Sequence, residues 1–153
     1  MSTDGLRTAA TTAVEQCLAL GADESCVVIT DDERRPIGAA LYDAAATVTD
    51  DATVPQYPPG EQHGAEPPAP VAAAMAEADA FLAPTTKSLS HTRARGVACE
   101  AGARGATLPG ITEEVFVTGL DADYDAIAAH CANVREQVAG ADEIRVTTPA
   151  GTD

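Results

Sequence analysis

The chain has 153 residues, of which 24 are Asp or Glu and nine are Lys or Arg, giving a formal net charge of −15. This length allows one domain of ordinary size, or slightly more. A field this negative excludes nonspecific binding to nucleic acid, because it repels phosphate groups. No run approaches the roughly 18 uninterrupted apolar residues that a membrane-spanning helix needs, so we expect no membrane association.

The composition allows two interpretations. Only 27 residues are Leu, Ile, Val or Phe, and such a content at high net charge is typical of disordered chains. The same composition suits a folded protein in molar salt, where the Debye length falls to about 3 Å and carboxylate repulsion is screened. Because the apolar residues follow ordered patterns, we expect a halophilic, acidic protein of a high-salt cytoplasm, with its four cysteines reduced.

The first third of the chain alternates between helical and strand patterns. Apolar residues at helical spacing predict an amphipathic helix over residues 6–18 that stops at Gly21. Residues 26–30, Cys-Val-Val-Ile-Thr, form an apolar run typical of a strand buried on both faces. A charged loop over residues 31–35 follows, and a proline suited to the first helical turn opens a helix over residues 36–46.

The middle of the chain continues this alternation less regularly. Residues 51–57 are expected to hold a second strand, in which Pro55 indicates a position at the edge of the sheet. A proline-rich loop over residues 58–70 precedes a helix over 71–78 and a third strand over 80–83.

The last part of the chain is predicted to hold three more helices and two more strands. A helix over residues 93–101 leads to a fourth strand over 104–108, and Thr112 is placed to cap the next helix. A further helix over residues 122–139 precedes a fifth strand over 143–148. The apolar face of that further helix consists of Tyr124, Ile127, Cys131, Val134 and Val138.

This order of elements predicts an α/β fold, with a mostly parallel, five-stranded sheet and flanking helices, similar to a Rossmann fold. We expect a single α/β domain over residues 1–148. We interpret residues 149–153 as the start of a second domain that is missing from this chain.

One segment departs from the acidic background. Residues 80–99 contain three bases and no acid, so they carry +3, while the other 133 residues carry −18. The polar loop over 84–92 is expected at the carboxyl end of the third strand, where ligands bind in open parallel sheets. It stands just before a helix N-terminus, which favours anions. We therefore predict a pocket for a carboxylate or phosphate, formed by Lys87, Ser88, Ser90, His91, Thr92, Arg93, Arg95 and, from another loop at the same edge, Arg34.

The same residues are also compatible with structural roles. The bases could neutralise neighbouring acids while Ser90 or Thr92 caps the helix. His91 is either an accessory general base or ligand donor, or a hydrogen-bonded loop histidine. Residues 31–33, Asp-Asp-Glu, could form a carboxylate cluster but are more typical of a solvated loop. We can assemble no nucleophile with its base and no metal site, so we assign no catalytic residue, metal ligand or cofactor to this chain.

Six blocks of the sequence carry a resemblance to a known family. The most specific block is residues 87–95, Lys-Ser-Leu-Ser-His-Thr-Arg-Ala-Arg, and the others are residues 30–38, 63–68, 101–104, 108–114 and 148–153. These blocks resemble aminopeptidase T-like proteins, the leucyl aminopeptidase group of metallopeptidases, and more distantly the 2,5-dihydroxypyridine dioxygenases. The resemblance covers nearly the whole chain, but residues 48–57 lack the apolar strand that it would lead one to expect.

The resemblance implies the amino-terminal α/β domain of a metalloaminopeptidase, an enzyme that removes the N-terminal residue of a peptide. Family members hold a divalent metal through residues of a carboxyl-terminal domain, so no metal ligand transfers to this chain, and the chain alone is expected to be inactive. His91 and its neighbours would face that metal centre. The alternatives are a stand-alone module that binds a small anionic ligand or peptide, and an oligomerisation partner that docks on a second copy or on a separately encoded catalytic chain.

Overall fold

The computed structural model describes residues 3–151, and the chain divides into two compact units, Met1–Ala122 and Asp123–Asp153. The sequence pattern places a boundary after residue 148 instead, and the assignment of a second domain there stays a prediction. None of the helices among residues 3–151 is long and apolar enough to cross a membrane.

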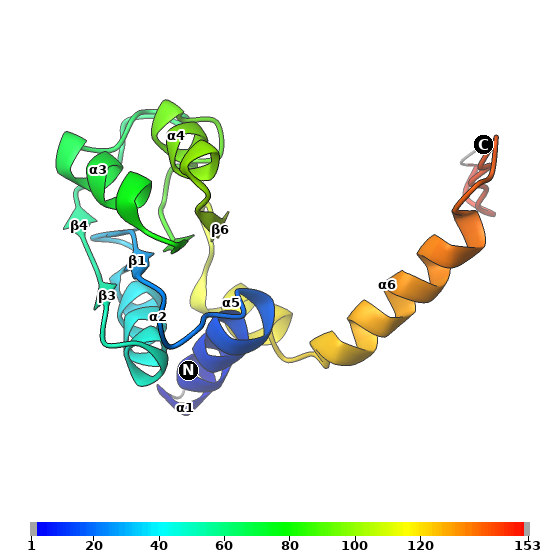
Figure 1. The fold of residues 1–153 in the computed structure, drawn as a ribbon, viewed down its shortest axis with the longest axis horizontal. Helices are drawn as coiled ribbons and strands as arrows, with labels where there is room; N and C mark the ends of the chain where they lie inside the picture. The colour runs from blue at the N-terminus through cyan, green and yellow to red at the C-terminus, as the bar shows by residue number, and fades with distance from the viewer. Residues whose placement is uncertain (1–2, 152–153) are drawn as a thin grey trace. The chain divides into compact units, whose positions relative to one another are not determined.

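The first unit is built around a parallel sheet of four strands (Figure 1). In spatial order these are β3 (Ala52–Thr53), β1 (Cys26–Val28), β5 (Ala80–Ala83) and β6 (Arg104–Thr107). All three neighbouring pairs are parallel. Along the chain, β1 is followed by β3 on one side of it and then by β5 on its other side. The direction in which strands are added to the sheet therefore reverses between β1 and β5.

A short second ladder continues the pairing of β1 with β3. β2 (Thr30–Asp31) pairs in parallel with β4 (Gln56–Tyr57), and the register continues without a shift. Pro55 interrupts the strand because proline has no amide hydrogen to donate, although its carbonyl accepts a hydrogen bond from the Thr30 amide at 3.1 Å. The strand predicted over residues 51–57 therefore exists as two short pieces, and it lies at the edge as expected.

Four helical segments cover one face of the sheet. They are α1 (Thr3–Thr11), the π-helical η1 (Thr12–Cys17), α2 (Arg35–Val48) and α5 (Glu113–Gly119). Val28 and Leu82 reach this layer from the strands and pack with the buried Phe116 of α5. Thr112 caps α5 as predicted, since its hydroxyl accepts a hydrogen bond from the Val115 amide at 3.2 Å. The helices predicted over residues 6–18 and 36–46 are confirmed as α1 with η1 and as α2.

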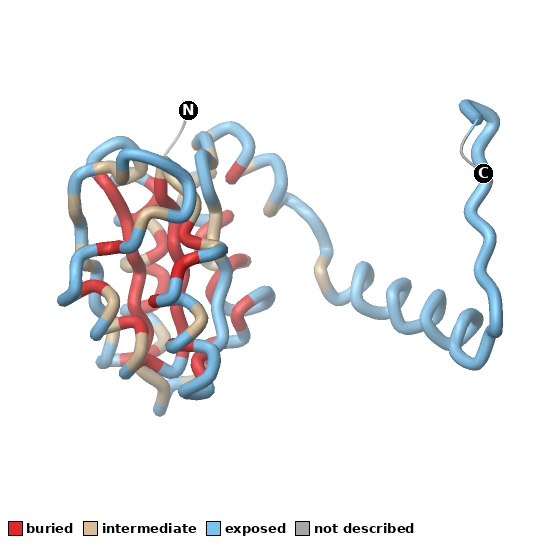
Figure 2. The backbone as a smooth tube through the Cα atoms, turned by 90° about the horizontal axis from the view of Figure 1, so that it is seen from above, coloured by how far each residue is buried: buried red, intermediate tan, exposed pale blue. Residues whose placement is uncertain are grey.

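The opposite face is covered by α3 (Ala69–Glu77) and α4 (Arg93–Ala101). Val27 and Phe81, which alternate with the residues of the first face, point into this second layer. The outer strand β6 approaches β5 closely at Gly105, where an added Cβ would lie 2.2 Å from the Phe81 carbonyl oxygen. Figure 2 shows the buried strands between the two helical layers, which confirms the expected α/β class.

The second unit contains one helix, α6 (Tyr124–Val138), and an irregular segment. The Asp123 carboxylate caps the helix by accepting a hydrogen bond from the Ala126 amide at 2.9 Å, and Gly140, with φ of 89°, follows its end. No fifth strand forms over residues 143–148, so the main sheet has four strands and not five. The alternating Ile and Val residues of this segment favour a strand, but no strand among the described residues pairs with it.

Candidate functional site

The reversal of strand order brings two loops together at the carboxyl ends of β1 and β5. One loop runs from β2 into α2, and the other, residues 84–92, runs from β5 into α4. Asp31 joins them, because its carboxylate accepts hydrogen bonds from the Thr86 amide at 2.5 Å and from the Thr86 hydroxyl at 3.0 Å. Such a reversal is where ligands bind in open α/β sheets.

Asp31 also organises its own loop. The residue is 1% exposed, and its Oδ1 atom accepts hydrogen bonds from the amides of Glu33 and Arg34, each at 3.1 Å. A buried carboxylate requires such donors because burial removes its water. The prediction of a solvated loop over residues 31–33 is therefore wrong for Asp31. Burial raises the pKa of the neighbouring Tyr57, and the negative charge of Asp31 raises it further.

Arg34 lies beside this junction at the start of α2. The helix is held close to β2 at Gly38, where an added Cβ would lie 2.6 Å from Cβ of Thr30. The Nε atom of Arg34 is buried and has no hydrogen-bond partner among the described residues, while Nη1 donates to the Glu33 carbonyl at 3.5 Å. The guanidinium thus retains a donor that the described chain does not satisfy.

The N-terminus of α4 already holds a carboxylate of the same chain. The two carboxylate oxygens of Glu66 accept hydrogen bonds from the amides of Arg93 at 2.6 Å and Ala94 at 3.1 Å. Thr92 caps the helix as predicted, by accepting from the Arg95 amide at 3.3 Å. Because Glu66 occupies the first-turn amides that favour anions, an external anion would have to be bound by side chains at this edge.

The predicted hydroxyl groups bond to one another and to neighbouring loops. The Ser88 hydroxyl donates to Ser90 Oγ at 2.9 Å, and Ser90 Oγ lies 2.7 Å from Thr107 Oγ1 at the end of β6. The Ser88 amide donates to Nδ1 of His63 at 3.1 Å, and the Ser88 carbonyl accepts from the Gly64 amide at 2.9 Å. These bonds bring the proline-rich loop to the same edge of the sheet.

The predicted basic side chains differ in their surroundings. Lys87 is half-buried beside Gly60 of the proline-rich loop, and His91 and Arg95 are exposed. Arg93 instead lines a groove of about 330 Å³ that is also bordered by residues of α3. Within the described residues, no ion pair is formed by Arg34, Lys87, Arg93 or Arg95.

Sequence reasoning missed the contacts that Asp31, His63 and Glu66 make in this region. Asp31 carries no local sign of burial, because its contact with Thr86 spans 55 positions. His63 and Glu66 lie in residues 63–68, one of the blocks that carry the family resemblance, and only this resemblance pointed to them in the sequence. Among residues 3–151, no three His, Cys, Asp or Glu side chains are grouped so that they could hold a metal ion.

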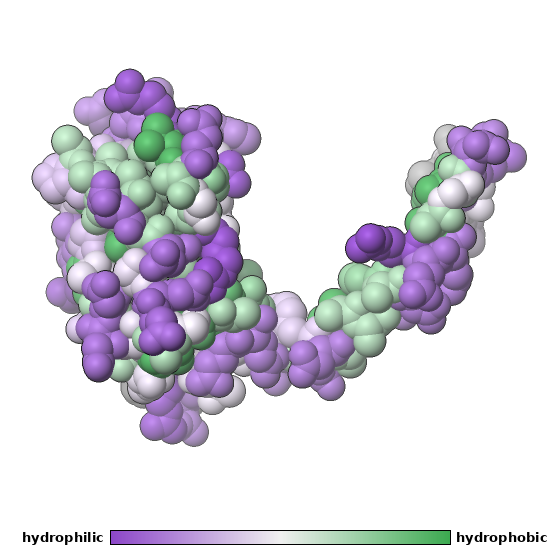
Figure 3. Space-filling view, viewed as in Figure 1, coloured by the Kyte–Doolittle hydropathy of each residue, from purple (hydrophilic) through white to green (hydrophobic). Residues whose placement is uncertain are grey.

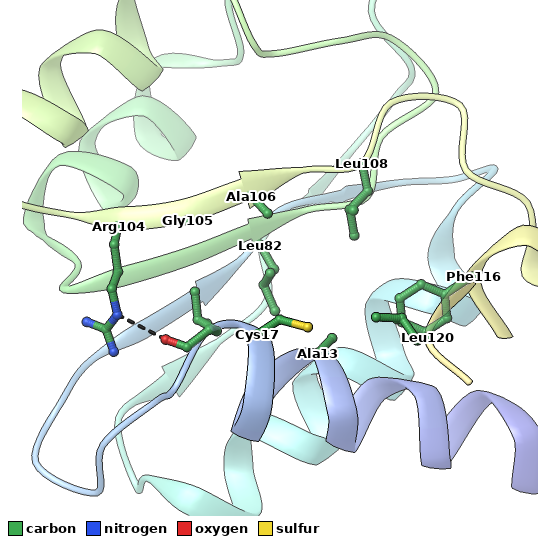
Figure 4. A pocket seen from close by; sticks show the side chains of 10 residues that line it. Ala13, Cys17, Leu82, Arg104, Gly105, Ala106, Leu108, Phe116 and Leu120 are labelled. Carbon is green, nitrogen blue, oxygen red and sulfur yellow. Dashed lines mark hydrogen bonds between the residues drawn. The ribbon is translucent and has the colours of Figure 1, made fainter. Parts of the chain in front are cut away.

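A separate pocket of about 350 Å³ lies beside β6 (Figure 4). Its lining is apolar and includes Leu108 and Phe116. Arg104 also lines it, but its guanidinium donates to the Leu18 carbonyl at 3.0 Å and to Glu24 at 2.6 and 2.7 Å. The sequence contains no signal for this pocket, because its lining comes from four separate elements, η1, β5, β6 and α5, and from residues next to them.

Two solved structures share the fold. The 2,5-dihydroxypyridine dioxygenase from Pseudomonas putida KT2440 has a TM-score of 0.66 and 16% identity, over 88% of this chain and 42% of that one. AmpT from Thermus thermophilus has a TM-score of 0.52 and 20% identity, over 89% of this chain and 48% of that one. No family model matches the sequence, and no curated protein matches it.

These two structures are of the kinds that the sequence blocks resemble. The resemblance to aminopeptidase T-like proteins and to 2,5-dihydroxypyridine dioxygenases is therefore confirmed at the level of the fold. At 16% and 20% identity the likeness shows the fold alone. The chain spans less than half the length of either protein.

Proposed function

We propose that this chain supplies the α/β domain of an aminopeptidase T-like metalloenzyme and binds substrate beside a domain that holds a divalent metal. The observation that carries the proposal is the Asp31–Thr86 junction. It joins a loop that bears Arg34 to a loop that bears Lys87, at the sheet edge where parallel α/β folds bind ligands. The fold likeness to AmpT supports the same conclusion.

The side chains present indicate what this chain and the metal-holding domain would each contribute. Arg34, Lys87 and Arg95 attract the carboxylate of a peptide, since cations without ion-pair partners bind such groups strongly. His91, exposed on the same loop, is an accessory group that faces the second domain. The metal, held by that other domain, would supply the activation of water for peptide-bond hydrolysis. The described chain offers no metal-binding cluster of its own, so we derive no hydrolytic step from it.

Two observations test this function. The purified chain, supplied with Zn²⁺, Co²⁺ or Mn²⁺, is expected to release no product from aminoacyl-p-nitroanilides, and turnover by the chain alone would contradict the proposal. The coding DNA beyond the codon for Asp153 is expected to encode a domain with His and Glu ligands, in frame or after a frameshift. An unrelated gene directly after a stop codon would count against it.

A second proposed function is a stand-alone module for small anions. It is favoured by the cations without ion pairs in a chain whose net charge is −15. Calorimetry in molar KCl would titrate phosphate, a free amino acid and a dipeptide into the chain. We expect Lys87→Ala to weaken binding by about tenfold, equivalent to about 1.4 kcal/mol, and Arg7→Ala, on α1, to leave it unchanged. Equal binding by wild type, Lys87→Ala and Arg95→Ala would show that the site is assigned wrongly.

We also propose that the protein works in a high-salt cytoplasm. The support is compositional: 24 acids, nine bases and few large apolar residues. Salt screens the acids and strengthens apolar burial, so dialysis from molar to millimolar KCl is expected to unfold the chain. Circular dichroism during heating measures this, and a cooperative melt that does not change with salt would contradict it.

A further inference from the structure

We propose that His63 is a positioning residue of the candidate site, which holds the peptide group between Lys87 and Ser88 and so fixes the backbone that carries Lys87. His63 lies in a strap, residues 61–66 of the proline-rich loop, which leads into α3. The consequence for binding rests on the proposed function, whereas the contact itself does not. All of these residues belong to the first unit.

Two side chains hold the Lys87–Ser88 peptide group. The Lys87 carbonyl accepts a hydrogen bond at 2.7 Å from the hydroxyl of Thr85, a residue that is 1% exposed. The Ser88 amide donates to Nδ1 of His63 at 3.1 Å. The carbonyl and the amide of a planar trans peptide group point in opposite directions. Bonds to both of them therefore fix the orientation of the group and of the backbone that carries the Lys87 side chain.

The strap is bound to the site loop and to α4 at further points. The Gly64 amide donates to the Ser88 carbonyl at 2.9 Å, so His63 and Gly64 together bind both polar backbone groups of Ser88. The Glu66 carboxylate accepts from the first amides of α4, at the end of the same loop. Among these contacts, the one made by His63 is the contact to the peptide group of Lys87.

The contact requires one form of the His63 ring. A backbone amide can only donate, so Nδ1 carries no proton, and in the neutral ring the proton lies on Nε2.

The surroundings of His63 indicate a local effect. The side chain is exposed, and Figure 3 shows hydrophilic residues along the upper edge of the first unit, around α3 and α4. A single hydrogen bond in water contributes little to global stability but can order a loop. Loss of this bond should therefore loosen the site loop without unfolding the sheet.

NMR of the full chain in molar KCl tests the contact without a ligand. At about pH 8, where imidazole groups are mostly neutral, spectra of the ring nitrogens should show the His63 proton on Nε2. His63→Ala should speed the exchange of the Ser88 amide hydrogen by about tenfold. His63→Asn should restore slow exchange, because its side-chain oxygen can accept in place of Nδ1. Gln62→Ala, at an exposed neighbour, should leave it unchanged, and the β5 amides should exchange alike in all four proteins.

Calorimetry with the dipeptide alanylalanine in molar KCl tests the consequence for binding. His63→Ala should weaken the affinity by about threefold or more, His63→Asn should bind nearly as wild type does, and Gln62→Ala should bind as wild type. In a chain that already carries Lys87→Ala, His63→Ala should have no further effect, because His63 acts through Lys87.

The two measurements separate this inference from the proposed function. If the wild-type chain binds no dipeptide, the proposed binding role of the loop is wrong, and the exchange of the Ser88 amide decides whether His63 holds the loop. A proton on Nδ1 of the neutral ring, unchanged exchange in His63→Ala, or fast exchange in His63→Asn would overturn the inference. In a chain that binds the dipeptide, an equal effect of His63→Ala with and without Lys87 would overturn it as well.

Discussion

A carboxylate links β1 to β5 at each end of the two strands, but the two carboxylates differ in their surroundings. At the amino end, Asp79 accepts hydrogen bonds from the Ser25 amide at 2.9 Å and the Ser25 hydroxyl at 2.8 Å. Next to it, Glu24 pairs with Arg104 of β6 at 2.6 Å. At the carboxyl end, the buried Asp31 takes its hydrogen bonds from neutral donors.

The two ends differ in how much positive charge remains available to bind a ligand. At the amino end the charges are used within the fold: the hydrogen bond from Arg104 lowers the pKa of Glu24 to about 2, and the Ser25 donors lower the pKa of Asp79. At the carboxyl end Arg34 and Lys87 form no ion pair among the described residues. The amino end therefore stabilises the sheet, and the carboxyl end keeps positive charge available.

Removal of the carboxylate at the carboxyl end should have the largest effect. Asp31→Ala leaves the amides of Glu33, Arg34 and Thr86 without their acceptor in a buried place, and we expect a loss of about 3 kcal/mol or more in the free energy of unfolding. Urea unfolding in molar KCl measures it. The control is Asp32→Ala, an exposed neighbour, for which we expect less than about 1 kcal/mol. Equal losses would show that Asp31 is not the junction.

The corresponding change at the amino end should be smaller. Arg104→Ala removes the pair with Glu24 and the hydrogen bonds to the carbonyls of Leu18 and Ala19. Because Arg104 itself is exposed, water can replace part of these bonds, and we expect a loss of about 1–2 kcal/mol by urea unfolding. Arg93→Ala, which breaks no ion pair, should change stability by less than about 0.5 kcal/mol. A loss larger than that of Asp31→Ala would reverse the comparison of the two ends.

The elements of the first unit could be predicted because their signals are local. The strand over residues 80–83 and the helix over 93–101 agree with β5 and α4 to the residue. The predicted fifth strand shows the limit of such signals. Ile144 and Val146 alternate as in a strand, but they are 60% and 66% exposed, and a strand needs a pairing partner that local pattern does not reveal.

The candidate site was predictable only in part. The absence of acids over residues 80–99 drew attention to the loop that the structure places at the strand reversal, while the role of this loop in binding stays a prediction. The same pattern could not reveal that Glu66 binds the first turn of α4, or that Asp31 is buried, because both contacts join loops that the strand order brings together. Strand order is a property of the whole sheet and leaves no mark at any one residue.

Acid should weaken the amino end through Glu24. Its pKa falls from 4.5 to about 2 in the folded chain, so its pairing stabilises the fold fully above about pH 4.5, and this contribution is lost as the pH falls through about 2. Unfolding free energies measured from pH 5 to 2 in molar KCl should therefore fall more steeply for wild type than for Glu24→Gln. Parallel pH profiles of the two proteins would mean that the pair with Arg104 does not form in solution.

The smallest effect is expected for the cations of the carboxyl end. Lys87→Ala and Arg95→Ala break no ion pair in the described chain, so each should change the free energy of unfolding by less than about 0.5 kcal/mol. Urea unfolding in molar KCl measures both changes. A loss as large as that of Arg104→Ala would show that Lys87 and Arg95 stabilise the fold. The two ends of the sheet would then differ in burial, but the carboxyl end would not keep more positive charge available for a ligand.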